Sequence, residues 1–151
     1  MKLILKFVAV AVLGTMPAVL PSAAEEAKTA IMYKPLQCGC CDEYAKYLES
    51  HGFKVTVQSL PERRLDGIKR QAAVPRDFEG CHTLMVDGYV VEGLVPIGPL
   101  NKLLTEKPNI KGISLPGMPI GSPGMPGRKT GPLIIYELPH GSPPPKEFAR
   151  E

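Results

Sequence analysis

Short apolar runs alternate with amphipathic segments between residues 29 and 105 of the chain. The apolar runs combine β-branched, aromatic and other large side chains, which is typical of strands that are buried on at least one face. The amphipathic segments carry apolar residues three and four positions apart, which predicts helices. The predicted strands are 29–33, 53–57, 83–86 and 89–94, and the predicted helices are 42–51, 61–73 and 99–105.

The order of these elements predicts the fold class. A strand–helix–strand start requires a parallel pair of strands, and Asp87-Gly88 between the last two strands is a strong hairpin signal. The hairpin is expected to add an antiparallel edge to the sheet. This arrangement resembles that of thioredoxin, so we predict an α/β fold over residues 25–110: a thioredoxin-like mixed sheet with flanking helices.

The chain changes character after residue 110. It has 15 Gly and 17 Pro, and many of them lie in this part, which indicates long loops. One apolar run, 133–136, is a candidate for a further strand. We therefore expect a Gly/Pro/Met-rich extension over residues 111–138 that contributes to the site, and a flexible tail over residues 139–151.

The N-terminus has the pattern of an export signal. Lys2 and Lys6 precede an apolar run over 7–20, and Ser22-Ala23-Ala24 supplies the small residues that a signal peptidase requires. The run is shorter than the roughly 20 residues of a membrane span. We predict a signal peptide over residues 1–24, a periplasmic location and no membrane contact after cleavage, with an uncleaved anchor as the alternative.

The charge of the chain excludes one broad class of partner. The formal net charge is only +3, so nucleic-acid binding is not expected. The basic residues cluster on the predicted helix 61–73, where Arg63, Arg64, Lys69 and Arg70 fit a solvent-exposed face.

Four cysteines carry the candidate chemistry. Cys38 and Cys41 have the C-x-x-C spacing of a redox dithiol in the loop before the first predicted helix, whose end favours thiolate. Cys40 between them could attack any disulfide formed there, which a dedicated oxidoreductase does not need. In a thioredoxin-like layout the loop that carries Cys81 faces this stretch, so all four sulfurs could converge. Two structural disulfides in an exported chain are a further alternative.

Soft donors favour Cu(I) over zinc. Zinc sites with four cysteine ligands usually separate their ligand pairs by a few residues on each side, whereas crowded thiolates suit bridged Cu(I) ions.

Pro-Gly-Met-Pro occurs twice, at residues 116–119 and 123–126, and places Met118 and Met125 on a loop with little core to fill. Their thioethers suit Cu(I), although a stiff linker is the alternative. His82 is equally consistent with a ligand and with an incidental residue, whereas Met85 lies in a predicted strand and fits the core.

These motifs together resemble the exported copper-resistance proteins of the CopG type, a family also known as domain of unknown function 411. The similar motifs are Cys38-Gly39-Cys40-Cys41, 80–83, 88–96 and 116–125. The resemblance implies a thioredoxin-like fold with a cysteine-bridged, multinuclear Cu(I) site that allows redox activity. It implies that Cys38, Cys40, Cys41 and Cys81 bridge the ions, and that His82, Met118 and Met125 complete or cap the site. Relatives commonly have His where this chain has Leu94, which removes one candidate ligand.

The sequence therefore predicts a periplasmic copper-binding protein in copper resistance, with copper ions and copper carriers or exporters as its partners. A thiol–disulfide oxidoreductase that uses Cys38 and Cys41 is the alternative. The sequence leaves open whether the protein stores copper or catalyses its oxidation and reduction.

Overall fold

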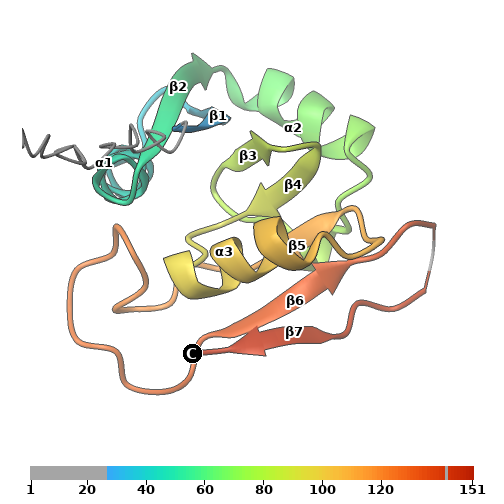
Figure 1. The fold of residues 1–151 in the computed structure, drawn as a ribbon. Coiled ribbons are helices and arrows are strands. Elements are labelled where there is room, and N and C mark those ends of the chain that lie inside the picture. Colours follow the sequence, from blue (N-terminus) through green and yellow to red (C-terminus); the bar gives the residue numbers. More distant parts are fainter. Residues whose placement is uncertain (1–26, 142) are drawn as a thin grey trace, which may run out of the picture.

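A computed structural model describes residues 27–141 and 143–151, so the predicted signal peptide lies outside the described residues. Within these residues, eleven elements follow one another (Figure 1). They are β1 (Lys28–Pro35), α1 (Gly39–Ser50), β2 (Phe53–Leu60), α2 (Glu62–Gln71), the 3-10 helix η1 (Arg76–Phe78), β3 (Thr83–Val86), β4 (Tyr89–Glu92), α3 (Ile97–Glu106), β5 (Gly112–Ser114), β6 (Ile134–Leu138) and β7 (Glu147–Arg150).

The predicted order of strands and helices up to α3 is confirmed, and so is the α/β class with a mixed sheet and flanking helices. β1 pairs with β2 in parallel, and β3 pairs with β4 in an antiparallel hairpin. The turn residues Asp87 and Gly88 both have positive φ, at 48° and 81°, as a two-residue hairpin requires. The start of α1 differs from the prediction, because the helix begins at Gly39 and includes Cys40 and Cys41 in its first turn.

The sheet extends further than the sequence predicts. In the described part of the chain it has seven strands, in the order β2-β1-β3-β4-β5-β6-β7, so the β3–β4 hairpin lies inside the sheet and not at its edge. The candidate strand at 133–136 is β6, which begins at Ile134, and β5 was not expected. Residues 147–150 form β7 in place of flexible chain, because they pair with β6.

Two clusters of buried side chains lie against the sheet. The larger one joins α1 and α3 to the sheet through residues such as Tyr44, Leu48, Leu100 and Leu103. The smaller one contains Val74, Val90 and Leu138, with Met85 packed against it. In the described residues, no helix has both the length and the apolar character needed to cross a bilayer.

Candidate metal centre

Strand pairing brings the four cysteines to one end of the sheet. Cys38 is the N-cap residue of α1, three residues after the end of β1, and Cys81 lies two residues before β3. Because β1 and β3 are antiparallel, with Tyr33 opposite Thr83, the end of β1 and the start of β3 meet. The predicted convergence of the four sulfurs follows from this topology.

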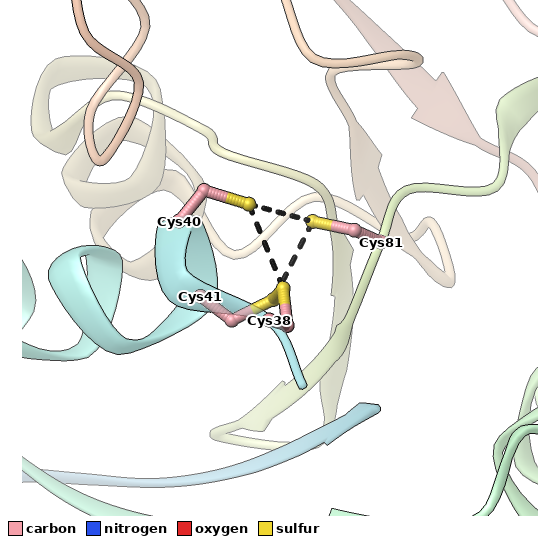
Figure 2. Close-up of side chains that lie close together, drawn as sticks. All are labelled: Cys38, Cys40, Cys41 and Cys81. Atoms are coloured by element: carbon pink, nitrogen blue, oxygen red, sulfur yellow. Dashed lines mark hydrogen bonds between the residues drawn. A yellow bond between two sulfur atoms is a disulfide. The ribbon is translucent and has the colours of Figure 1, made fainter. Parts of the chain in front are cut away.

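The four sulfur atoms form a compact group (Figure 2). All four Sγ atoms lie within 4.8 Å of one another. Cys38 and Cys41 form a disulfide, whereas Cys40 and Cys81 are free thiols. The Cys40 Sγ atom lies 3.5 Å from that of Cys38 and 3.9 Å from that of Cys81, and the Cys41 and Cys81 Sγ atoms are 3.5 Å apart. Such a group can exchange disulfides or bind soft metal ions.

The thiol of Cys81 holds its proton strongly. Burial is the main cause that raises its pKa to about 12, and the neighbouring Cys40 adds to the effect. At neutral pH this thiol is therefore protonated and a poor nucleophile, because the thiolate is the reactive form. A metal ion that binds Cys81 must displace its proton, so metal binding releases protons.

His82 lies fully buried behind the cysteines. Its Nδ1 atom is 3.6 Å from Cys81 Sγ, and its ring packs against that of Tyr44 with the centroids 5.0 Å apart. Within the described residues, its Nε2 atom has no hydrogen-bond partner. Burial first, and then the charge of Lys69, lower the pKa of His82 to about 3. The imidazole is therefore neutral at neutral pH, which is the form that binds metals.

Because His82 is buried in its neutral form, we expect the folded protein to lose stability in acid. Between pH 6.5 and pH 3 the unfolded chain binds a proton at this residue and the folded chain does not, so stability falls as the pH falls. From pH 7 to pH 4.5 this difference contributes about 2.5 kcal/mol. The free energy of unfolding of the metal-free protein can be measured with urea at both pH values. Its decrease from pH 7 to pH 4.5 should be smaller in His82→Leu than in wild type by this amount. An equal loss in both proteins would contradict this origin.

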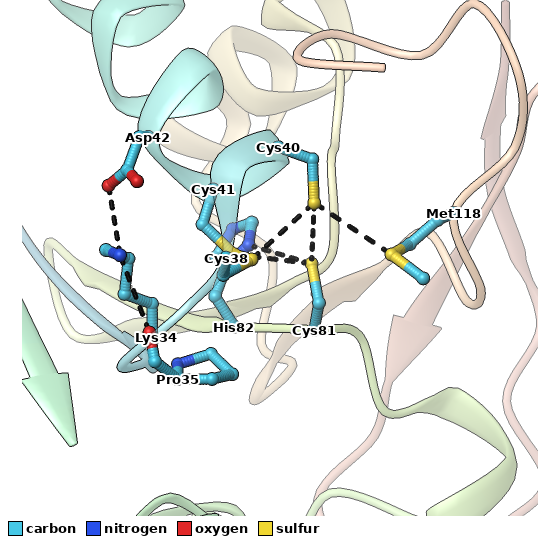
Figure 3. Close-up of a disulfide and its surroundings, with 9 residues drawn as sticks. All are labelled: Lys34, Pro35, Cys38, Cys40, Cys41, Asp42, Cys81, His82 and Met118. Carbon is cyan, nitrogen blue, oxygen red and sulfur yellow. Dashed lines mark hydrogen bonds and ion pairs between the residues drawn. A yellow bond between two sulfur atoms is a disulfide. The ribbon is translucent and has the colours of Figure 1, made fainter. Parts of the chain in front are cut away.

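The two repeats of the extension lie beside the first turn of α1. The Met118 Sδ atom lies 3.9 Å from Cys40 Sγ, and its side chain is 51% exposed (Figure 3). In the second repeat, a Cβ on Gly124 would lie only 2.5 Å from the Cys40 carbonyl oxygen. Glycine there allows the loop to approach α1 closely. Met125 is partly buried and packs against the larger core cluster. Among the described residues, the thioether within hydrogen-bond range of a cysteine sulfur is that of Met118.

A buried ion pair supports the loop before Cys81, and sequence reasoning missed it. Lys69, placed on a solvent-exposed face by the sequence pattern, is 3% exposed, and its Nζ atom lies 2.5 Å from a carboxylate oxygen of the fully buried Glu92. Glu92 also accepts hydrogen bonds from the Gly80 amide and the Thr83 hydroxyl. Burial raises the pKa of Glu92, against the opposing effect of Lys69. The signal in the sequence was an acidic residue that ends an apolar strand.

The fold and the cysteine cluster define a class of protein: a mixed α/β protein with a soft-metal or thiol-redox centre at one end of its sheet. The family model described as "Protein of unknown function, DUF411" matches residues 78–125. Two solved structures, both described as "Copper resistance protein copG", are similar to the chain. Form 2 has 34% identity and a TM-score of 0.75, and covers 83% of this chain and 99% of its own. Form 1 has 34% identity and a TM-score of 0.74, and covers 83% and 98%.

This degree of identity and coverage shows that the chain belongs to the CopG family of copper resistance proteins, as its motifs predict. No curated protein matches the chain. Leu94 is fully buried in the larger core cluster, and its side chain offers no donor atom.

Proposed function

We propose that this chain is a periplasmic copper-binding protein that holds several Cu(I) ions in a cysteine-bridged cluster. The observation that carries the proposal is the approach of four cysteine sulfurs to within 4.8 Å of one another, with the Met118 thioether beside them. Thiolate and thioether are the donors that favour Cu(I). The membership of the CopG family supports copper as the metal.

The sulfur spacing suits shared ions. Metal–thiolate bonds of about 2.3 Å place two sulfurs on one ion about 3.8–4.0 Å apart. The separations of 3.5 and 3.9 Å between the other pairs of cysteine sulfurs approach this value, whereas Cys38 and Cys41 would bind as thiolates only after their disulfide is reduced. Four thiolates in one place repel one another, and several monovalent cations that bridge them would neutralise this charge. His82 and Met118 are adjacent donors, and Met125 stays a proposed ligand.

One observation favours a second function, that of a thiol–disulfide oxidoreductase: Cys38 and Cys41 form a disulfide at the start of a helix. Two neighbours make this arrangement unusual for such an enzyme. Cys40 Sγ lies 3.5 Å from Cys38 Sγ, and Cys81 Sγ lies 3.5 Å from Cys41 Sγ. An enzyme that needs only the pair would retain its activity in Cys40→Ser and Cys81→Ser, whereas a four-cysteine cluster would not survive either change.

Copper titration under anaerobic conditions separates the two functions. We expect native mass spectrometry of the fully reduced protein to show several Cu(I) ions per chain, with fewer ions in Cys40→Ser and in Cys81→Ser. The same two variants should be assayed for the reduction of a disulfide substrate. A reduced protein that binds no Cu(I), or that prefers a single zinc ion, would contradict the proposal. Disulfide turnover that survives both substitutions would support the oxidoreductase.

A further inference from the structure

The Cys38–Cys41 disulfide leaves three other sulfur atoms side by side. Cys40 and Cys81 are free thiols, and their Sγ atoms are 3.9 Å apart. The Met118 Sδ atom lies at the same distance, 3.9 Å, from Cys40 Sγ. The Cys40 sulfur therefore lies equally far from the sulfurs of Cys81 and Met118, and Figure 3 marks both approaches among the dashed lines that start at Cys40.

These separations match those of sulfurs bound to one ion. With metal–sulfur bonds of about 2.3 Å, trigonal coordination places sulfurs about 4.0 Å apart and tetrahedral coordination about 3.8 Å apart. The observed 3.9 Å lies between these values. The sulfurs of Cys38 and Cys41 are not available as thiolates while they are bonded to each other, and thiolate is the form that binds metals.

We propose that the disulfide form of this chain is a second binding state, in which Cys40, Cys81 and Met118 hold a single soft monovalent ion, Cu(I) or Ag(I). This inference rests on the proposed copper-binding function. The disulfide then sets the capacity of the protein: one ion when Cys38 and Cys41 are bonded, and several when all four cysteines are thiols.

The surroundings of the three sulfurs suit one monovalent ion. Two thiolates and one monovalent cation leave a single negative charge on the group. Met118 is 51% exposed, so its thioether provides a route of entry from solvent. Two thiolates and one thioether are soft donors, and soft donors favour the soft ions Cu(I) and Ag(I).

Conversion between the two states is a two-electron step. A dithiol reductant transfers two electrons and two protons to the Cys38–Cys41 bond, which breaks to give two thiols, while the reductant becomes a disulfide. The two new thiols release their protons when further ions bind. In the reverse step a disulfide oxidant accepts two electrons and two protons and becomes a dithiol, while Cys38 and Cys41 form their disulfide and release those ions.

Silver titration tests the capacity of each state, because Ag(I) is a soft monovalent ion that does not supply electrons to the disulfide. The full protein should be titrated anaerobically without a thiol and followed by native mass spectrometry. Its disulfide is verified beforehand by a mass that is two hydrogens lower than that of the fully reduced protein. We expect one Ag(I) per oxidised chain and several per reduced chain. In Met118→Leu, the affinity of the oxidised chain should fall about tenfold or more.

Two further variants make the test specific. Met85→Leu removes a thioether that packs against the other core cluster, so the binding of the oxidised chain should not change. Cys38→Ala/Cys41→Ala should bind one Ag(I) even under reducing conditions, because the three-sulfur site is intact. Its folding can be verified by circular dichroism against the oxidised wild type.

The outcomes separate this inference from the function on which it rests. The inference would be overturned if the oxidised chain bound no ion, or as many ions as the reduced chain. In either case, several ions in the reduced chain would still support the copper cluster. Equal affinity in Met118→Leu, or several ions in Cys38→Ala/Cys41→Ala, would also overturn it. A reduced chain that binds neither Ag(I) nor Cu(I) would contradict the proposed function itself.

Discussion

Replacement of Lys69 by Met should lower the free energy of unfolding by about 3–5 kcal/mol, because it leaves a buried carboxylate without its partner. Lys69 and Glu92 are 3% and 0% exposed, and the Lys69 ammonium is also 3.2 Å from the Thr83 hydroxyl, to which it donates a hydrogen bond. Methionine has a similar length, so the change removes the charge and little of the packing. Urea unfolding at pH 7 measures the loss.

The pH dependence of this loss in the free energy of unfolding, together with a double variant, identifies its cause. Lys69→Met should raise the pKa of Glu92 further, so the penalty is full above that raised value and disappears below the pKa of the unfolded carboxyl, about 4.3. The gap between wild type and variant should therefore narrow as the pH falls. Lys69→Met/Glu92→Gln should recover part of the stability. A gap that is independent of pH, with no recovery in the double variant, would show that lost packing is the cause.

Gly80→Ala should both destabilise the fold and disrupt the metal centre. A Cβ at residue 80 would lie 2.3 Å from the Gly93 nitrogen and 2.4 Å from its Cα, so one of two backbone segments must move. We expect a loss of about 2–3 kcal/mol in the free energy of unfolding. Because Cys81 is the next residue, its sulfur should leave the cluster, and the number of Cu(I) ions bound by the reduced protein should fall.

Gly39→Ala is the matched control, because Gly39 also precedes a cysteine of the cluster. A Cβ at residue 39 meets no atom within 4 Å, and the residue begins α1. Alanine in a helix is favoured over glycine by up to about 1 kcal/mol, so the variant should be as stable as wild type or slightly more so. Equal copper binding by Gly80→Ala and Gly39→Ala would contradict the role assigned to the Gly80–Gly93 contact.

Local pattern was sufficient to predict most of the fold up to residue 106. Strands such as 83–86 were predicted with their observed bounds, because they are bounded by a clear turn at Asp87-Gly88. β5 and β7 were not predicted, because these strands form through pairing with distant partners. The three residues 112–114, for example, form a strand only beside β4 and β6. A pattern that includes Gly112 gives no local signal for a strand.

The site shows the same division between local and distant causes. The spacing of Cys38, Cys40 and Cys41 predicted that these three sulfurs lie together. The predicted strand order placed Cys81 beside them. Lys69 could not be placed by helix periodicity, because its burial is set by Glu92 on another element. The proximity of Met118 to Cys40 depends on the path of the extension over α1, which no local pattern contains.

The most direct test of the copper cluster is X-ray absorption at the copper edge on the fully reduced protein loaded anaerobically with Cu(I). We predict copper in the monovalent state with sulfur as its dominant neighbour, and a copper–copper distance short enough to require bridging thiolates. That copper–copper signal should be lost in Cys81→Ser. A spectrum with isolated copper ions, or with mainly nitrogen and oxygen neighbours, would contradict a cysteine-bridged cluster.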